Sequence, residues 1–286
     1  MNLKHQPVNL DKLIELAIAE DIGDGDHTSL ACIPTEAKGK AQLLVKEEGI
    51  LAGMTVAKKV FNTIDSSIKF TALLEDGNPI KVGDIAFYVE GSRLSILKAE
   101  RLALNFMQRM SGIATKTNYY VSLLEGLPTK ILDTRKTTPG LRAIEKLAVK
   151  IGGGENHRMG LYDMIMIKDN HIDYAGGIEN AIKTTQAYLN ATQKNLKIEI
   201  EARNLDELHQ ILAVGGVDVI MLDNFSFDEL RKAVKLINGN YKTEASGGIT
   251  EKTIRKYAEC GVDFISVGAL THQINSLDLS LKAIKT

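Results

Sequence analysis

The chain has 286 residues, of which 44% are hydrophobic and 25% are charged, and its formal net charge is −1. This length suits one large domain with a smaller one, and the balanced charge gives no overall field that would hold nucleic acid or acidic lipid. The two cysteines have no metal-ligand spacing, and no apolar run approaches the roughly 20 residues of a membrane span. We therefore expect a soluble, cytoplasmic protein with reduced thiols.

The first part of the chain predicts a small α+β domain over residues 1–112. Apolar residues recur at helical spacing in Leu10–Ala19, and short strands broken by Gly follow. The expected strands lie within 38–53, 67–80 and 84–91, with a helix at about 54–65 among them. A long helix is expected from Ser95 to about Gly126, with Gly112 as a candidate interruption.

The second part alternates strands and helices and predicts a barrel domain over residues 113–272. The expected strands are 130–134, 164–168, 197–201, 218–223, 242–246 and 263–268. Helical segments between them open with capping Asn204, Ser226 or Thr250 and close on Gly. Strand ends recur every 22 or 23 positions, which favours parallel strands in a (β/α) barrel. Because only six strands can be counted, we expect an incomplete barrel.

Polar side chains stand at the end of nearly every expected barrel strand. These residues are Asp133, Thr134, Arg135 and Lys136 after the first strand, Lys168 after the second, Glu201 and Asp223 at the ends of the third and fourth, Ser246, Gly247 and Gly248 at the fifth, and Gly268 and Ala269 at the sixth. Barrel enzymes build their active sites from the loops at this end of the strands. The strand ends are therefore the candidate site.

The residue types at these ends indicate which ligands they could bind. Arg135 and Lys136 suit carboxylates or pyrophosphate, although such residues are often solvated loop cations. Lys168 is a ligand group or a Schiff-base nucleophile. Glu201 and Asp223 suit a metal or acid–base role, or cap the next helix. The small-residue turns SGG and VGA, each expected to enter a helix, suit a phosphate.

The segment KIGGGENHRMGLYD joins the first two barrel strands. Its glycines lack the spacing of a P-loop or a dinucleotide-binding loop. His157 and Arg158 are read as cations on a flexible approach to the site, with a plain surface loop as the alternative. Five cationic or potentially cationic residues thus fall on the first two units, and the carboxylates fall on later ones.

The chain resembles the quinolinate phosphoribosyltransferase family over essentially its whole length. The resemblance rests on EDIGDGDHTS, AERLALNFMQRMSGIAT, ILDTRKTTPGLRAIEKLAVKIGGGENHRMGLYDMIMIKDNHI, IEIEARN, MLDNFS, EASGGIT and SVGALTH. It implies a small α/β sandwich domain, onto which the tail 273–286 packs back, and an incomplete α/β barrel. It also implies a homodimer or hexamer whose active site takes residues from a neighbouring subunit.

The same resemblance implies an activity in NAD biosynthesis. Quinolinate and phosphoribosyl pyrophosphate would condense, with Mg²⁺, to nicotinate mononucleotide, pyrophosphate and CO2. By motif, the ligands of quinolinate and pyrophosphate would be Arg135, Lys136, His157, Arg158 and Lys168, with Thr134 beside them and Arg101 contributed across the dimer. Glu201 and Asp223 would serve the metal, directly or through water, and the ribose. Ser246, Gly247, Gly248, Gly268 and Ala269 would hold the 5′-phosphate, with His272 close behind.

Two other activities remain open on the sequence. A related phosphoribosyltransferase could accept nicotinate or another acid, including the relatives found in molybdenum operons. A lyase or aldolase could use Lys168 as a Schiff-base amine, in which case the pair Arg135 and Lys136 would lack a purpose. A non-catalytic binding protein should have lost some of the charged strand ends, and none is missing.

Overall fold

The computed structural model describes residues 10–284, which fold as two compact units. Of the described residues, the first unit comprises 10–118, 137–153 and 269–284, and the second comprises 119–136 and 154–268. The two units therefore do not meet at the single boundary expected between residues 112 and 113. Residues 113–118, 137–153 and 269–272, expected in the barrel domain, belong to the first unit.

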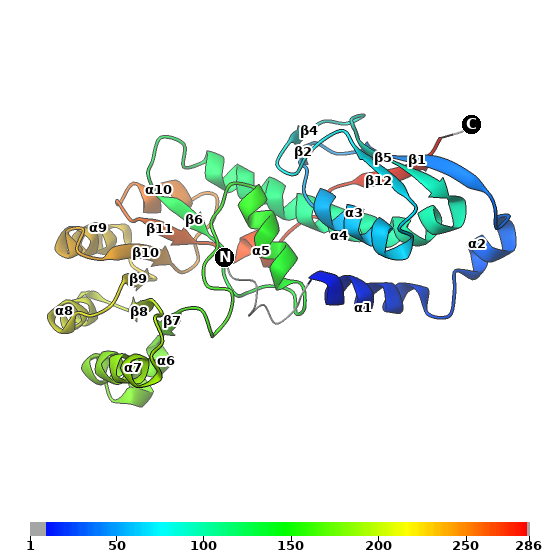
Figure 1. The fold of residues 1–286 in the computed structure, drawn as a ribbon. Coiled ribbons are helices and arrows are strands. Elements are labelled where there is room, and N and C mark those ends of the chain that lie inside the picture. The colour runs from blue at the N-terminus through cyan, green and yellow to red at the C-terminus, as the bar shows by residue number, and fades with distance from the viewer. Residues whose placement is uncertain (1–9, 285–286) are drawn as a thin grey trace. The chain divides into compact units, whose positions relative to one another are not determined.

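The first unit combines helices with an antiparallel sheet (Figure 1). Its elements are α1 (Leu10–Ile22), α2 (His27–Cys32), β1 (Lys38–Val45), β2 (Gly49–Ile50), α3 (Met54–Ile64), β3 (Lys69–Ala72), β4 (Pro79–Ile80), β5 (Ile85–Ser92), α4 (Arg93–Ser122), α5 (Arg142–Ile151), α11 (Ala269–His272) and β12 (Leu279–Ala283). The four-stranded sheet has the order β12-β1-β5-β3, and β2 pairs with β4. Strand β12 of the C-terminal tail pairs antiparallel with β1, Leu43 lying opposite Leu281.

Aromatic packing joins α3 to this sheet. The rings of Phe61 on α3 and Phe87 on β5 lie 6.0 Å apart, and that of Phe70 on β3 lies 4.4 Å from Phe87. Val56, Val60 and Phe61 are almost wholly buried, as expected for apolar residues at helical spacing on a face turned to a core. Aromatic pairs at these distances add to the stability gained from burial.

Helix α4 is continuous through Gly112, contrary to the interruption considered from the sequence. A Cβ atom at Gly112 would lie 2.1 Å from the backbone oxygen of Asn275 in the C-terminal tail. Gly152, the cap residue after α5, is likewise placed so that a Cβ would lie 2.4 Å from the oxygen of Ala114. Both glycines thus permit close packing of backbone on α4, and Gly152 belongs to helix packing rather than to a ligand loop.

The second unit is a six-stranded parallel sheet with helices between the strands. Its elements are β6 (Lys130–Leu132), β7 (Ile165–Ile167), α6 (Asp169–Ala175), α7 (Ile178–Thr192), β8 (Ile198–Ala202), α8 (Leu205–Val214), β9 (Val219–Asp223), α9 (Phe227–Ile237), β10 (Lys242–Ser246), α10 (Ile254–Ala258) and β11 (Phe264–Ser266). The strand order is β6-β11-β10-β9-β8-β7, and every pairing is parallel. This is the order of a (β/α) barrel left open between β6 and β7, so the fold class is confirmed.

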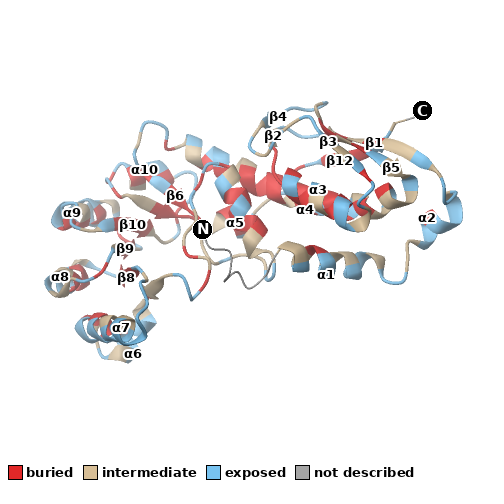
Figure 2. Ribbon diagram, in the orientation of Figure 1, coloured by how far each residue is buried: buried red, intermediate tan, exposed pale blue. Residues whose placement is uncertain are grey.

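Sequence features account for the helix positions in this unit. Helices α7, α8 and α9 lie side by side along the sheet in Figure 1. The strands are mostly buried, whereas the outward faces of these helices are exposed (Figure 2). Asn204 and Ser226 cap α8 and α9 by accepting the N–H groups of Glu207 and Glu229, as expected. The cap expected at Thr250 is wrong, because α10 begins only at Ile254.

Across residues 10–284, no helix combines the length and the apolar character that crossing a membrane requires.

Candidate active site

The carboxyl ends of the six parallel strands bring most of the expected site residues to one edge of the sheet. Arg135 and Lys136 follow β6, Lys168 follows β7, and Glu201 is the penultimate residue of β8. The other residues of this edge are Asp223 at the end of β9, Ser246 at the end of β10, Gly247 and Gly248 after it, and Gly268 after β11. Parallel strands end on the same side, so charges separated by up to 88 positions in the chain, from Arg135 to Asp223, share this edge.

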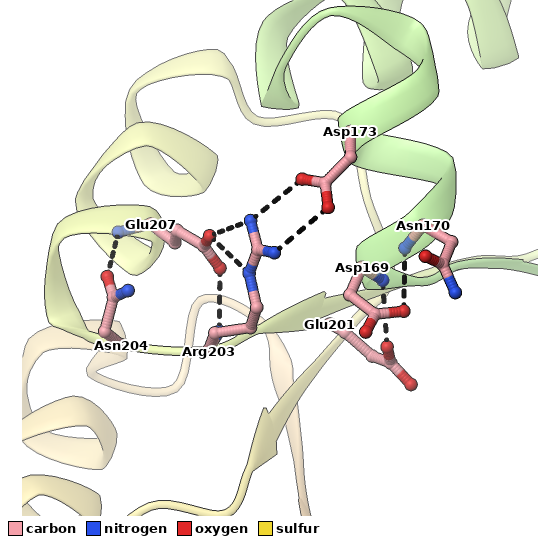
Figure 3. Close-up of polar contacts among 7 residues, drawn as sticks. All are labelled: Asp169, Asn170, Asp173, Glu201, Arg203, Asn204 and Glu207. Atoms are coloured by element: carbon pink, nitrogen blue, oxygen red, sulfur yellow. Dashed lines mark hydrogen bonds and ion pairs between the residues drawn. The ribbon is translucent and has the colours of Figure 1, made fainter.

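Lys168 and Glu201 form an ion pair at this edge. The Glu201 carboxylate is almost fully buried, and its Oε2 also accepts the N–H of Asp169 at 3.1 Å (Figure 3). The backbone of Lys168 is also fixed, since its N–H donates to Nδ1 of His171 at 3.0 Å. The carboxylate therefore fixes both the side chain after β7 and the first residue of α6.

Arg203, the residue two positions after Glu201, is a structural clamp rather than a ligand group. Its guanidinium donates to Glu207 on α8 at 2.7 Å and to both carboxylate oxygens of Asp173 on α6 at 3.2 and 3.3 Å (Figure 3). Hydrogen bonds to Glu207 and Asp173 raise the pKa of Arg203. The clamp links α6 to α8 beside the Lys168–Glu201 pair, and this role was not foreseen from the sequence.

The carboxylate of Asp223 is oriented by its neighbour in the chain. Asn224 Nδ2 donates to Asp223 Oδ2 at 2.7 Å, and the Asn224 backbone N–H donates to the oxygen of Ser246 at 2.9 Å. Asn224 has φ of +58°, a left-handed conformation that asparagine tolerates better than most residues. Asn224 thus couples the end of β9 to the turn after β10.

The turn after β10 needs glycine at one position for space. A Cβ on Gly247 would lie 2.1 Å from Asn224 Oδ1 and 2.9 Å from the Asn224 backbone nitrogen, whereas a Cβ on Gly248 would meet nothing within 4 Å. Both residues have positive φ, +101° and +59°. The helix expected directly after SGG is absent, since α10 starts six residues beyond Gly248. An anion here would be bound by the backbone of the turn itself.

Replacing Gly247 with alanine is therefore expected to destabilise the protein by about 2–4 kcal/mol, through strained φ and displacement of Asn224. Gly248→Ala meets only the backbone strain and should cost about 1–2 kcal/mol. Chemical unfolding of the two variants beside the wild type measures the difference. Equal losses for the two alanines would contradict the contact with Asn224.

His157 lies where the sequence did not place it. The expected flexible approach is wrong, because the side chain is 8% exposed and its Nε2 lies 2.8 Å from Glu199 Oε2 and 3.4 Å from Glu244 Oε2. Burial lowers the pKa of His157, but the two carboxylates outweigh it and raise the pKa to about 10. Burial likewise raises the pKa of Glu199, to about 7, with the charge of Glu244 adding to it. In β8, whose sequence is IEIEA, the alternation could have signalled Glu199 as a charged position between apolar ones, whereas β10, KTEAS, gives no such signal for Glu244.

Arg158 is a buried cation close to another arginine. Burial lowers the pKa of its guanidinium, and the nearby Arg135 lowers it further, while Glu199, Asp163 and Glu201 oppose this. Its Nη1 donates to the oxygen of Met164 at 3.3 Å. Two guanidinium groups brought together in a partly buried place repel each other, and such a pair is stabilised when an anion binds between them.

Three expected residues lie in the first unit. Arg101 is exposed on α4, and Ala269 and His272 are the first and last residues of α11. This unit also contains a buried ion pair that was not predicted from the sequence. Arg109 donates to Glu145 at 2.6 and 2.8 Å and to Thr138 Oγ1 at 2.7 Å, so α4 and α5 together hold the loop that follows Lys136.

Arginine and lysine follow the first two parallel strands, and carboxylates stand at the ends of the next two. This arrangement is typical of a barrel enzyme that acts on anionic substrates. The family model described as the C-terminal domain of quinolinate phosphoribosyl transferase matches residues 113–282, and that of the N-terminal domain matches residues 26–111. The chain belongs to the quinolinate phosphoribosyltransferase family.

Individual relatives agree over almost the whole chain. "Quinolinate phosphoribosyltransferase [decarboxylating] 1b" of Nicotiana tabacum is 44% identical, covering 97% of this chain and 83% of its own length. A "probable nicotinate-nucleotide pyrophosphorylase [carboxylating]" of Bacillus subtilis is 43% identical over 96% of this chain and 93% of its own. The structure of the nicotinate-nucleotide pyrophosphorylase from Francisella tularensis has a TM-score of 0.90 at 42% identity, covering 97% of this chain and 98% of that one.

Proposed function

We propose that the protein condenses quinolinate with phosphoribosyl pyrophosphate to give nicotinate mononucleotide, pyrophosphate and CO2. The observation that carries the proposal is that the buried guanidinium of Arg158 is acted on by the charges of both Arg135 and Glu201, and that Glu201 shares its edge of the sheet with Asp223. Quinolinate has two adjacent carboxylates, which two guanidinium groups match in charge and geometry. The names of the relatives, at 43–44% identity, describe the same reaction class.

The first step forms one bond and breaks one at C1 of the ribose. The ring nitrogen of quinolinate attacks C1, and pyrophosphate leaves with the electron pair of the C1–O bond. Positive charge that develops on the ribose is stabilised by the carboxylates of Glu201 and Asp223, and Lys136 and Lys168 offset the charge of the departing group. No covalent intermediate with the protein is needed.

The second step removes the carboxylate next to the ring nitrogen. After ribosylation the nitrogen is positively charged, so the C–C bond can break and leave its electron pair on ring carbon 2 as CO2 departs. That carbon then takes up a proton. Arg135 and Arg158 provide the positive surroundings that favour this carbanion, which is why no further cofactor is proposed for the step.

Mg²⁺ is part of this proposal. Glu201 and Asp223 supply hard oxygen ligands at the ends of the adjacent strands β8 and β9, and Mg²⁺ in such enzymes takes one or two carboxylates, directly or through water, with substrate phosphate oxygens. The residues therefore fit the ion. When bound, it would neutralise charge on the leaving pyrophosphate. The turn Ser246–Gly248, with Gly268, is proposed to hold the 5′-phosphate.

The proposal is tested by mixing protein, Mg²⁺, phosphoribosyl pyrophosphate and quinolinate and following both pyrophosphate and CO2. Equal release of the two products supports it, and release of neither by folded protein rejects it. Nicotinate as the acid tests the related transferase, for which pyrophosphate would appear without CO2. Borohydride trapping of a carbonyl substrate on Lys168 would instead favour a lyase, but that amine is already paired with Glu201.

A homodimer or larger assembly with shared sites is also proposed, and the exposed position of Arg101 on α4 supports it. If Arg101 acts in a neighbouring subunit, Arg101→Ala and Lys168→Met should each be inactive alone. Mixed and reassembled, they should regain up to about a quarter of wild-type activity, because some sites then contain neither change. No recovery in verified mixed assemblies would place Arg101 in the site of its own subunit.

The cytoplasm is the proposed location, and it rests on the two unpaired cysteines, Cys32 and Cys260. Some plant relatives carry the words chloroplastic or mitochondrial in their names, which describe those proteins.

A further inference from the structure

Three buried acidic side chains converge on one short segment inside the second unit. Asp133 follows β6, Glu199 lies in β8 and Glu244 lies in β10, and each is at most 1% exposed. Side chains from alternate strands share a layer inside a (β/α) barrel, where Val, Ile and Leu are the usual occupants. Carboxylates in such a place are costly unless they are paired, so their presence calls for an explanation.

The segment that they surround is Asn156–Arg158. Asp133 Oδ1 accepts the backbone N–H of His157 at 2.9 Å, and Asp133 Oδ2 accepts the side-chain amide of Asn156 at 2.6 Å. On the other side, the His157 ring reaches Glu199 and Glu244 through Nε2, at 2.8 and 3.4 Å. Side chains from β8, from β10 and from the residue after β6 thus hold Asn156 and His157 from different directions.

The second ring nitrogen of His157 completes a rigid connection. Nδ1 accepts the backbone N–H of Arg158 at 2.8 Å, so the ring in this geometry carries its proton on Nε2, facing the carboxylates. The raised pKa of His157 favours a second ring proton, but a proton on Nδ1 would require that hydrogen bond to break, so the geometry is that of a ring protonated on Nε2 alone. The imidazole therefore spans from the two glutamates to the backbone of Arg158, and the charge of Arg135 acts on the guanidinium of that residue.

Two carboxylate oxygens of the cluster, Glu199 Oε1 and Glu244 Oε1, are buried and receive no hydrogen bond from a protein donor among residues 10–284. The two carboxyl groups act on each other instead, since Glu244 helps to raise the pKa of Glu199. A buried acceptor without a partner lowers the free energy of unfolding. An arrangement selected for stability alone would not retain them, which indicates a role for the two carboxylates in the site.

We propose that Glu199 and Glu244 are positioning residues for the acid-binding end of the site: through His157 they set the place of the Arg158 guanidinium beside Arg135. The inference rests on the proposed function, because it takes the two arginines as the ligands of the substrate carboxylates. Neither glutamate touches the substrate. Their removal should therefore weaken binding of the acid while leaving phosphoribosyl pyrophosphate binding almost unchanged.

The same three side chains could in principle hold a metal ion, since His157, Glu199 and Glu244 offer ligand atoms within 4.8 Å of one another. A metal would need the lone pair of Nε2, and the hydrogen bond accepted by Nδ1 leaves the proton on Nε2. The geometry thus favours a shared proton over a metal. Elemental analysis of the purified protein distinguishes them, because stoichiometric metal that is lost in Glu244→Gln would overturn the proposal.

The steady-state test uses Glu199→Gln and Glu244→Gln, which keep the shape and remove the charge. KM for quinolinate should rise at least about tenfold in each, with KM for phosphoribosyl pyrophosphate within about twofold of wild type. Glu207→Gln is the matched control, a buried glutamate of the same unit that serves the Arg203 clamp, and it should change neither KM beyond about twofold. Equal changes in both KM values would indicate general damage and overturn the proposal.

A double-mutant cycle tests whether the glutamates act through Arg158. In an Arg158→Gln background, Glu244→Gln should have little additional effect on KM for quinolinate, because the group that it positions is gone. Additive effects would overturn the proposal. Thermal unfolding of all variants gives the accompanying readout: Glu244→Gln should not be less stable than Glu207→Gln, since it removes a buried charge that lacks full pairing.

Hydrogen exchange separates this inference from the proposed function. In the substrate-free protein, the amide of Arg158 should exchange faster in Glu199→Gln and Glu244→Gln than in the wild type, and at an unchanged rate in Glu207→Gln. If the wild type fails to convert quinolinate, the proposed function is rejected and the exchange rates alone decide the positioning. Unchanged exchange at Arg158 in both glutamine variants would overturn it.

Discussion

Replacing Arg135 with alanine is expected to lower kcat/KM for quinolinate by about 30-fold to several thousandfold. Leaving one member of a desolvated charge pair without its partner costs about 2–5 kcal/mol, and each 1.4 kcal/mol corresponds to a factor of ten. The loss should be large because the charge of Arg135 acts on the buried guanidinium of Arg158, and the two cations are proposed to share one anionic ligand. The measurement is initial velocity against quinolinate at saturating phosphoribosyl pyrophosphate.

Two further variants make this prediction specific. Arg135→Lys keeps the charge but not the planar fork, so it should recover only part of the loss. Arg231→Ala removes an exposed arginine that pairs with Asp228 on α9, and it should stay within about twofold of wild type. If Arg135→Lys equals the wild type, charge alone suffices and bidentate recognition by Arg135 is wrong. An unchanged kcat/KM in Arg135→Ala would remove the residue from the site.

Replacing Glu201 with glutamine is expected to reduce kcat by about two to three orders of magnitude. The change removes the partner of Lys168, whose side chain is 43% exposed, and weakens the bond from the Asp169 N–H. Losing one group that stabilises charge in the transition state costs about 10²–10³ in kcat. It also removes one of the two proposed oxygen ligands of Mg²⁺, so half-maximal activity should require more Mg²⁺. Single-turnover rates measured across a Mg²⁺ titration would report both effects.

The Lys168–Glu201 pair offers an internal check on this result. If the two side chains act as a unit, Lys168→Met combined with Glu201→Gln should lose much less than the product of the single losses. Glu207→Gln, which disturbs only the neighbouring clamp (Figure 3), should leave the Mg²⁺ requirement unchanged. A Glu201→Gln enzyme with normal kcat and normal Mg²⁺ dependence would contradict the assignment of this carboxylate.

The linear sequence predicted the second unit well because its elements depend on local signals. Strand β10 spans Lys242–Ser246, the same residues as the predicted strand, and Asn204 and Ser226 cap the predicted helices. Short apolar strands at a regular interval also indicated the parallel order. Once strands are parallel, their carboxyl ends must share an edge, so the common location of Lys168, Glu201 and Asp223 followed from the sequence alone.

Glycine and charge inside the fold were harder to interpret. Gly112 suggested a break in a helix, whereas the structure shows an unbroken α4 that the backbone at Asn275 approaches closely. His157 suggested a mobile cation, but it is buried between glutamates 42 and 87 positions further along the chain. The neighbouring residues in the sequence do not indicate which distant segment will contact each of these residues in the fold.

The sequence by itself determined the alternation of strands and helices, the edge at which the reactive groups gather and the family to which the chain belongs. Only the tertiary structure decided how those groups are held: Asp133, Glu199 and Glu244 around Asn156–Arg158, and Asn224 between Asp223 and Gly247. Periodicity and capping arise from neighbours within a few residues. The orientation of a buried side chain depends instead on hydrogen bonds and steric contacts that exist only after remote strands have paired.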